Sequence, residues 1–294
     1  LFRSCSFMGT EDRTTPALDE MAAEGFVFEN AIAPGPTTPE SLPPTFTGLD
    51  PVTPIGKHGD RLASAQDRIG AHLRARRSLP ERLAAEGYTT AGFTPNPWTS
   101  EYFGFDKGFD HFEDYMQVDL SSTLWERMLE GRSRQSFKAL RLLLSWIQRE
   151  NVFKPWEAFY DNIVSWADTA PEPYFLWIFL LDVHFPYLPS PQYRSQSRWR
   201  EYEANLRLYL ESQQTPYSPR VHDQLRTAYF DAVRYVDSFF AQLRADLDDE
   251  AVVIVHGDHG DAFGEHGSYT HQHELFEENI HVPLVVAGGP HGST

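Results

Sequence analysis

Apolar and polar positions along the chain follow a pattern that predicts strands and helices in turn. Strand-length apolar runs occur at residues 26–32, 172–187, 251–255 and 282–289. Amphipathic stretches with helical spacing lie between them, and the longest covers residues 221–247. Several of the apolar runs are continuous, which is typical of strands buried on both faces. The pattern therefore predicts an α/β fold with a mostly parallel sheet sandwiched by helices.

Helix ends are marked by capping residues, prolines and glycines. Thr15 precedes Pro16 at a predicted helix start, and Gly25 is predicted to end the same helix. Ser78 is predicted to cap a second helix, which leads into a strand. Thr38 also precedes a proline, and it is predicted to be the N-cap of a third helix.

Residues 115–170 differ from the rest of the chain. This segment has amphipathic helical spacing without the alternation of strands and helices. We therefore predict a helical insertion or lid within one catalytic domain that covers residues 1–294. The packing residues expected in it are Trp125, Leu129, Leu140, Leu144 and Trp166.

Composition allows a large core and restricts the partners. Of the 294 residues, 41% are hydrophobic and 14% are aromatic, which is enough to bury a sizeable core. The net charge is −17, and only four of the basic residues are lysines. An acidic, lysine-poor surface suits concentrated salt, so we hypothesise a halophilic source. The absence of a basic patch argues against nucleic acid as a partner.

The single cysteine, Cys5, excludes an internal disulfide and a zinc cluster of several thiolates. No apolar run approaches the roughly 18 residues that span a bilayer. The sequence does not begin with Met, and no signal peptide is visible in it. These features favour a cytoplasmic location for a chain that we expect to be truncated at both ends.

The segment HGDHGDAFGEHG, residues 256–267, directly follows an apolar run. Asp258 and His259 on this glycine-rich turn can face one divalent cation, because carboxylate and imidazole are common metal ligands. A polar loop in which Asp258 caps the next segment is the structural alternative. Seven of the twelve histidines follow residue 255, which favours the metal site. The other polar groups are interpreted as loop-shaping or supporting residues: His256, Asp261, Glu265 and His266.

Other candidate residues lie where predicted elements begin or end. Capping alone explains Thr38, but a hydroxyl at a helix N-terminus can also face an anion and attack it. His184 follows a strand, and it is either a packed side chain or a group that binds anionic oxygens or protonates a leaving group. Either His271 or His273 is a candidate general acid opposite the nucleophile.

Taken in order, these segments resemble the sulfatase branch of the alkaline-phosphatase superfamily. The most specific block is VIVHGDHGDAFGEHG with the following HQHELFEENIHVPLVV. TPALDEMAAEGFVFENAIA, TFTGLDPVTPIGKHG and PYFLWIFLLDVHFPYLPSPQY are similar to other family blocks. The match covers nearly the whole chain apart from residues 115–170.

The resemblance implies an alkaline-phosphatase-like fold with a divalent metal at the carboxyl edge of the sheet. It places Asp258 and His259 on the family's second pair of metal ligands. It places Thr38 on the nucleophile, and His184 and His271 on the substrate-binding histidines. The acidic pair that the family carries on an earlier strand is missing from this sequence. The chain is therefore expected to hold half of the metal site.

Two departures from the family pattern bear on the chemistry. Sulfatases proper carry Cys or Ser at the nucleophile, which becomes formylglycine, and Thr38 cannot make that conversion. A threonine resembles instead the lipoteichoic acid synthases and phosphoethanolamine transferases, with Ser41 as an alternative nucleophile. The family's Gly-Lys-Trp-His stretch is replaced by AGFTPNPW, which leaves Asn96 as a polar substitute. We predict that Asn96 and His273 contact the substrate.

These observations predict a metal-dependent hydrolase of sulfate or phosphate esters carried by small molecules or glycans. The resemblance favours Ca²⁺ as the cofactor, with Mn²⁺ or Mg²⁺ as alternatives. A phosphodiesterase or phosphotransferase that uses Thr38 is a second hypothesis. A catalytically silent binding module with a degraded site is a third, from a different functional class.

Overall fold

The computed structural model describes residues 4–49, 62–115, 154–210, 216–247, 250–271 and 273–289. It divides into two compact units. The first unit consists of Leu1–Pro36 and Asp182–Thr294, and the second of Thr37–Leu181. Most of the predicted insertion, residues 116–153, lies outside the described residues, so the insertion stays a prediction.

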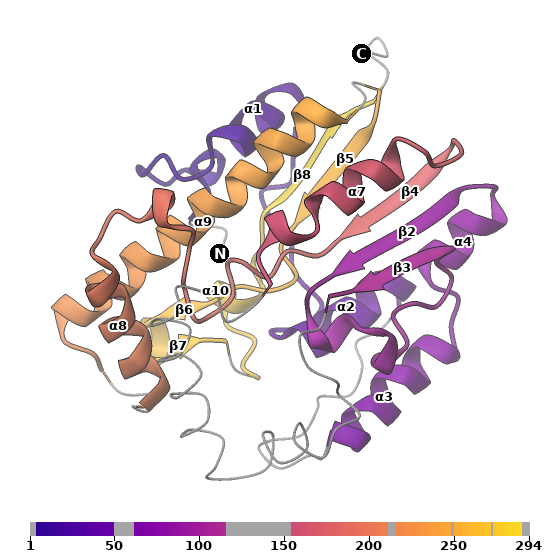
Figure 1. Cartoon of the computed structure of the whole chain (residues 1–294). Coiled ribbons are helices and arrows are strands. Elements are labelled where there is room, and N and C mark those ends of the chain that lie inside the picture. The colour runs from indigo at the N-terminus through magenta and orange to yellow at the C-terminus, as the bar shows by residue number, and fades with distance from the viewer. Residues whose placement is uncertain are drawn as a thin grey trace. The chain divides into compact units, whose positions relative to one another are not determined.

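The sheet of the first unit is antiparallel. Strand β8 (Leu284–Gly288) lies between β1 (Phe26–Val27) and β5 (Val252–His256). Figure 1 shows β5 and β8 side by side. One face packs against Leu18 and Met21 of helix α1 (Pro16–Glu24). The helices and strands of this unit build the α/β character that the sequence predicts.

The expectation of a continuously buried strand at residues 251–255 is wrong. Val252 and Ile254 are 58% and 61% exposed, whereas Val253 and Val255 pack against the α1 side of the sheet. In an antiparallel sheet one face can remain uncovered, and successive side chains then alternate between core and surface. Strand β5 is therefore covered by helices on one face only among the described residues.

Helix α9 (Pro219–Asp246) is the longest described helix, and it contacts both α1 and α8 (Arg198–Leu210). The Asp237 carboxylate accepts hydrogen bonds from the backbone N–H groups of Ala17 and Leu18, at 2.9 and 3.0 Å. These N–H groups have no partner within α1 because they belong to its first turn. Asp237 thus fixes the start of α1 against α9.

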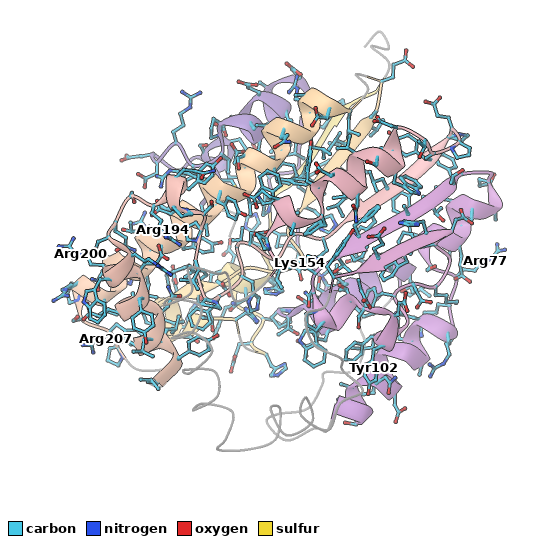
Figure 2. The ribbon with its side chains drawn as sticks, in the orientation of Figure 1. Arg77, Tyr102, Lys154, Arg194, Arg200 and Arg207 are labelled. Carbon is cyan, nitrogen blue, oxygen red and sulfur yellow. The ribbon has the colours of Figure 1, made fainter. Side chains whose placement is uncertain are left out.

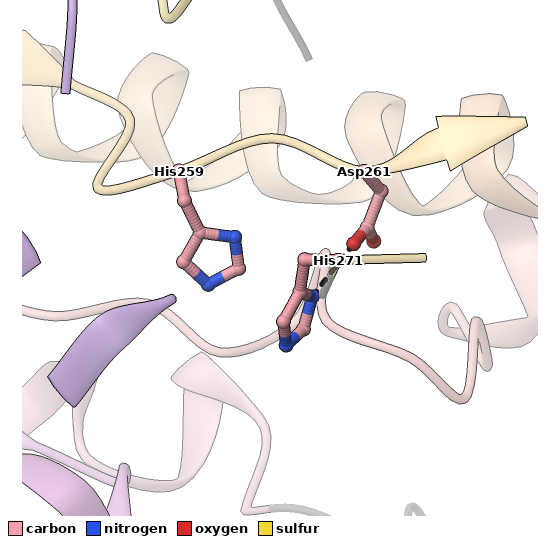
Figure 3. A group of neighbouring side chains, drawn as sticks. All are labelled: His259, Asp261 and His271. Carbon is pink, nitrogen blue, oxygen red and sulfur yellow. Dashed lines mark hydrogen bonds and ion pairs between the residues drawn. The ribbon is translucent and has the colours of Figure 1, made fainter. Parts of the chain in front are cut away.

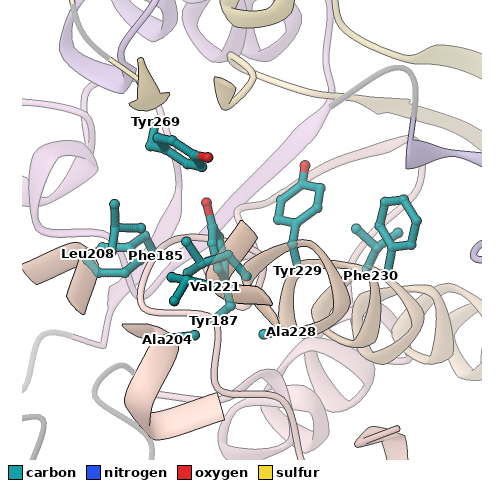
Figure 4. Packing of buried hydrophobic residues seen from close by; sticks show 11 residues of the cluster. Phe185, Tyr187, Ala204, Leu208, Val221, Ala228, Tyr229, Phe230 and Tyr269 are labelled. Carbon is teal, nitrogen blue, oxygen red and sulfur yellow. The ribbon is translucent and has the colours of Figure 1, made fainter. Parts of the chain in front are cut away.

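An aromatic core lies between α8, α9 and the chain that follows residue 184 (Figure 4). A short hairpin, β6 (Ala262–Phe263) and β7 (Tyr269–Thr270), borders it. The buried members of this core are Phe185, Tyr187, Ala204, Leu208, Val221, Leu225, Ala228, Tyr229, Phe230, Val233 and Tyr269.

Arginines around α8 form ion pairs with acidic residues. Arg194 lies 3.1 Å from Glu201, and Arg207 lies 3.6 Å from Glu203; both arginines are labelled in Figure 2. The Arg220 side chain also reaches Glu203, at 2.8 Å. The two pairs of Glu203 involve exposed arginines and add little stability, whereas the Arg194–Glu201 pair is largely buried.

The second unit contains the parallel sheet. Strand β2 (Thr89–Thr94) pairs in parallel with β3 (His111–Asp114) and β4 (Tyr174–Ile178). Two further helices of this unit, α4 (Leu79–Ala85) and α7 (Tyr160–Ala167), are shown in Figure 1. Parallel pairing fits the sequence prediction for this part of the chain.

Helices α2 (Thr38–Thr47) and α3 (Leu62–Arg74) supply much of the core of the second unit. Phe46 packs edge-to-face on Trp177 of β4, with ring centroids 4.9 Å apart. Helix α2 ends at Gly48, which has a φ of 66° and donates its N–H to Pro44. Glycine adopts this left-handed conformation without steric cost, which explains the Thr-Gly pair in the sequence.

Some predicted boundaries are shifted. The N-cap of α2 is Thr37 and Thr38 is the first helical residue, so the helix begins one residue earlier than predicted. The strand predicted at residues 172–187 is limited to Tyr174–Ile178. The apolar run beyond it is buried in part by aromatic packing, which the sequence pattern does not distinguish from sheet pairing. Among the described residues, no helix is long and apolar enough to span a membrane.

Candidate functional site

The loop that follows β5 is tied to its surroundings by backbone hydrogen bonds. Gly257 donates its N–H to Pro283 at 3.1 Å, and Gly260 donates to Asn279 at 2.7 Å. The side chain of Asn279, a residue of α10 (Glu277–Ile280), donates back to the carbonyl oxygen of Gly260. These bonds fix the backbone on which the side chains of residues 258, 259 and 261 stand.

Three side chains from this region converge (Figure 3). His259, Asp261 and His271 each offer one possible ligand atom, and these atoms all lie within 4.8 Å of one another. His271 Nδ1 donates to Asp261 Oδ1 at 2.7 Å, and the rings of His259 and His271 are 4.2 Å apart. The sequence predicted a ligand in His259 and a catalytic group in His271, but it assigned Asp261 only a supporting role.

Two more predicted residues lie beside this group. The ring centroid of His184 is 5.3 Å from that of His271. Asp258 Oδ2 lies 3.7 Å from His259 Nε2, and the Asp258 side chain is 17% exposed. The first unit therefore brings together four of the predicted site residues with Asp261. We call these five residues the histidine cluster: His184, Asp258, His259, Asp261 and His271.

Burial and neighbouring charges set the ionisation of the cluster. Burial, with a smaller contribution from the adjacent His271, lowers the pKa of His184 to about 4. Burial also lowers the pKa of His259, against the attraction of Asp258. Burial by itself raises the pKa of Asp261, but its bond to His271 and the surrounding histidines hold that pKa well below its usual range. His184 and His259 are thus neutral imidazoles near pH 7, and Asp261 is an ionised carboxylate.

The oxygen acceptors assign the tautomer of each ring. Nδ1 of His184 lies 2.5 Å from the carbonyl oxygen of Phe185, and Nδ1 of His259 lies 3.1 Å from that of Gly260. His271 Nδ1 faces the Asp261 carboxylate. Carbonyl and carboxylate oxygens only accept, so each Nδ1 carries the proton. In the neutral rings the lone pair therefore lies on Nε2, the form that coordinates a metal or accepts a proton.

The cluster meets the chemical requirements of a divalent metal site. Neutral imidazole nitrogen together with carboxylate oxygen suits Mn²⁺, Zn²⁺ or Fe²⁺ better than it suits Ca²⁺, which prefers oxygen ligands. A carboxylate behind a metal-binding or proton-transferring imidazole fixes its orientation and increases its basicity. Asp261 stands in this relation to His271.

Of the remaining predicted site residues, Thr38 and Asn96 belong to the second unit and His273 belongs to the first. Thr38 is buried at the first position of α2, where the helix N-terminus favours anions. Asn96 is 3% exposed, and its Oδ1 accepts from Trp98 N–H at 3.0 Å, which explains it as a local cap. The His273 side chain is exposed. Catalytic and substrate-binding roles for these three residues stay predictions.

Sequence reasoning did not identify Tyr187, whose hydroxyl donates to Asp261 Oδ2 at 2.9 Å. Tyr187 and Asp261 are 74 residues apart in the chain. No local pattern relates such distant positions. The one available signal was the repeat HGDHGD, which places Asp261 in the same context as Asp258.

The sequence matches a family model described as Sulfatase over residues 2–294. No curated protein matches the sequence significantly.

Solved structures share the fold at low sequence identity. The C-terminal periplasmic domain of EcEptC from Escherichia coli, a complex with Zn, has a TM-score of 0.63 and 16% identity, covering 97% of this chain and 69% of that one. The soluble domain of lipooligosaccharide phosphoethanolamine transferase A from Neisseria meningitidis has a TM-score of 0.57 and 17% identity, with coverages of 98% and 73%. A 2-O GAG sulfatase has a TM-score of 0.60 and 16% identity, with coverages of 98% and 62%.

The chain thus spans between 62% and 73% of the lengths of these three structures. Because the first of them is a periplasmic domain, the likeness gives no support to the cytoplasmic location that the sequence favoured.

Proposed function

From the premise that the chain belongs to the sulfatase family, we propose that it is a metal-dependent hydrolase of sulfate or phosphate esters. The observation that carries the proposal is the histidine cluster, in which two candidate metal ligands and two candidate substrate-binding histidines lie together. With a divalent cation bound, such a group would give an anionic ester a local site of positive potential in a chain of net charge −17.

In this proposal Asp258 and His259 hold the metal ion. When bound, a divalent cation neutralises anionic ester oxygens and lowers the pKa of a coordinated hydroxyl. The sequence favoured Ca²⁺, but the imidazole at position 259 supports a transition metal such as Mn²⁺ or Zn²⁺ better than it supports Ca²⁺. A solved structural relative is a complex with Zn, which is consistent with this choice.

His271 and His184 are assigned different roles. Asp261 lies against Nδ1 of His271, and a carboxylate in that position stabilises the imidazolium that forms during proton transfer. Nδ1 of His184 faces the carbonyl oxygen of Phe185, and burial lowers the pKa of this ring to about 4, so near pH 7 it is neutral with a lone pair on Nε2. We therefore assign donation of the Nε2 proton to the leaving oxygen to the doubly protonated form of His271, and to His184 a contact with a hydroxyl group of the substrate through Nε2.

Thr38 is the proposed nucleophile. Its support is local: the residue begins α2, where helix N–H groups and the helix dipole favour negative charge. The sequence resemblance places the family nucleophile at the same position. Attack by the threonine hydroxyl displaces the ester oxygen and leaves a sulfated or phosphorylated threonine, which water then hydrolyses.

A phosphotransferase or phosphodiesterase is the second candidate. Two observations favour it: threonine replaces the residue that forms formylglycine, and one of the solved structures sharing the fold is a phosphoethanolamine transferase. In this case the phosphorylated threonine passes its group to an acceptor alcohol rather than to water.

An assay of this protein with an aryl sulfate, an aryl phosphate and a phosphodiester tests the proposal, with Ca²⁺, Mn²⁺, Mg²⁺ and Zn²⁺ added separately. We expect turnover of at least one monoester that a chelator abolishes. Turnover of the diester alone would favour the second candidate. A protein that binds none of the metals and turns over none of the substrates would support a silent binding module.

Thr38→Ala should lower turnover by about 10³-fold or more, because loss of a covalent nucleophile removes the main pathway. Thr45→Ala is the matched control, since Thr45 is an exposed residue of the same helix and bonds only to the backbone of Ser41 among the described contacts. A fully active Thr38→Ala variant would eliminate Thr38 as the nucleophile.

A further inference from the structure

Asp261 accepts a hydrogen bond from Nδ1 of His271, and Tyr187 donates to the other oxygen of Asp261. We infer that both are positioning residues, which keep the proton of His271 on Nδ1 and present Nε2 as the atom that exchanges protons. The catalytic consequence rests on the proposed function. The arrangement of the side chains stands without it.

The carboxylate of Asp261 has one donor at each oxygen. His271 Nδ1 donates to Oδ1 at 2.7 Å, and the Tyr187 hydroxyl donates to Oδ2 at 2.9 Å. Tyr187 is fully buried, and the Asp261 side chain is 8% exposed. Bonds between a charged carboxylate and donors in a buried setting are stronger and more directional than neutral ones. Asp261 therefore has one preferred orientation.

Tyr187 is itself held firmly. Its N–H donates to Asn205 Oδ1 at 2.9 Å, and its carbonyl accepts from Asn205 Nδ2 at 3.1 Å. Asn205 is a fully buried residue of α8. The Tyr187 ring stacks on Phe263, with ring centroids 5.8 Å apart. It also packs edge-to-face on Tyr229, with ring centroids 5.1 Å apart, and both tyrosines are labelled in Figure 4. This packing directs the hydroxyl towards Asp261.

The same contacts argue that Asp261 supports His271 rather than binding the metal directly. To turn an oxygen towards an ion, Asp261 would have to weaken its bond to His271 or leave the buried Tyr187 hydroxyl without an acceptor. A buried donor that loses its acceptor carries the full cost of its desolvation. Asp261 is thus best placed to fix the His271 ring, as a carboxylate does behind a catalytic or metal-binding imidazole.

His271 differs from His184 and His259 in the kind of acceptor that its Nδ1 faces. Nδ1 of His184 and Nδ1 of His259 each face the carbonyl of the next residue in the chain, Phe185 and Gly260. Those acceptors are part of the local backbone, whereas the acceptor of His271 is a side chain oriented by Tyr187. Substitution at Tyr187 should therefore disturb His271 and leave the other two rings unchanged.

The experiment is nitrogen-15 NMR of the histidine rings, recorded on the wild type and on Asp261→Asn, Tyr187→Phe and Tyr229→Phe. In the wild type we expect a strongly hydrogen-bonded proton on Nδ1 of His271. The Asp261→Asn variant should lose that signal, and Tyr187→Phe should shift it. Tyr229→Phe is the matched control, because Tyr229 packs against Tyr187 but its hydroxyl makes no hydrogen bond to Asp261. The signals of His184 and His259 should keep their positions in all variants.

Kinetics give the second readout. We expect kcat to fall about 100-fold in Asp261→Asn and about 10-fold in Tyr187→Phe, with KM little changed, as for loss of an orienting carboxylate and of one charge-assisted hydrogen bond. Because the two residues act in one chain, the double variant should be no slower than Asp261→Asn alone. Unfolding midpoints identify any variant whose loss is due to misfolding, and Asp261→Asn, which keeps the shape of the side chain, remains informative if Tyr187→Phe is unstable.

The two hypotheses fail differently. A His271 signal that is unchanged in both Asp261→Asn and Tyr187→Phe would overturn the inference, and so would fully additive effects in the double variant. If the His271 signal changes as expected in the variants but the wild type turns over no ester, the proposed function is overturned and the positioning of His271 stays supported.

Discussion

Two buried carboxylates of the first unit have opposite properties. Asp261, in the histidine cluster, has a pKa well below its usual range. Glu201, on α8, has its pKa raised to about 7, mainly by burial. Asp261 accepts hydrogen bonds from His271 and Tyr187, whereas neither oxygen of Glu201 accepts one among the described residues. Arg194 at 3.1 Å offsets the burial of Glu201 only in part.

Between these two buried carboxyl groups, the hydrogen-bond donors, and not the degree of burial, decide which one is charged. Both side chains are almost completely inaccessible to solvent. Asp261 keeps its charge because two donors and three imidazoles surround it, while Asp231 on α9 adds a like charge near Glu201. A site that binds anions and metal ions needs a carboxyl group that stays ionised, as Asp261 does.

The largest expected effect follows from Asp261→Ala. This variant removes the acceptor from two buried donors, Tyr187 Oη and His271 Nδ1, at about 1–3 kcal/mol each. We expect the free energy of unfolding in urea to fall by about 4 kcal/mol. Asp261→Asn, which retains one acceptor oxygen, should lose clearly less. Equal losses in the two variants would mean that the oxygen retained by asparagine contributes nothing and that the charge of Asp261 is what stabilises the fold.

Glu201→Gln should remove a pH dependence of stability. The carboxyl pKa is about 7 in the folded protein and 4.5 in the unfolded chain, so the folded state binds the proton more tightly. The unfolding free energy of the wild type therefore falls as pH rises from about 4.5 to about 7. The difference between variant and wild type should change by up to about 3 kcal/mol over this window. A constant difference would contradict the raised pKa.

His259→Ala should separate the two regions by their response to metal. Added Zn²⁺ or Mn²⁺ should raise the melting temperature of the wild type and of Glu201→Gln, because a bound ion stabilises the folded state. The His259→Ala variant should bind metal at least about 100-fold more weakly, as expected for loss of a ligand. His256→Ala is the control, since His256 is the exposed last residue of β5, directly before the loop that carries His259. Equal weakening in both variants would indicate surface binding.

The smallest effect is expected for Asp237→Asn, at a third buried carboxylate. Burial raises the pKa of Asp237 to about 6, although two backbone N–H groups of α1 donate to it. An asparagine keeps one acceptor but places an amide NH₂ against the other donor. We expect a loss of about 1 kcal/mol in unfolding free energy at pH 8, typical of a helix-capping group. A neutral result would show that the charge of Asp237 is dispensable.

The local elements of the fold could largely be predicted from the sequence. Ser78 forms the predicted cap, with a full capping box through Glu81, because capping depends on residues three positions apart. The helix predicted at residues 221–247 is α9, which begins two residues earlier and ends one residue earlier than predicted. The strands were less predictable. An apolar run does not reveal whether a second layer or an aromatic loop covers it, so β4 and β5 differ from expectation.

The candidate site could be predicted in part. His184, Asp258, His259 and His271 were identified by residue type and by a family resemblance, and the structure brings them together. Tyr187 could not be identified, because an ordinary buried tyrosine and one that orients a carboxylate have the same sequence signature.

The sequence by itself determined the family, the capped helices and the residue types that can bind a metal and transfer a proton, because these depend on short spacings and on side-chain chemistry. The tertiary structure alone decided which of those side chains meet and how each is ionised. Asp261 is charged and oriented because Tyr187 and His271, distant in the chain, donate to its two oxygens. Hydrogen bonds between remote segments, and the solvent exclusion that strengthens them, exist only in the folded chain.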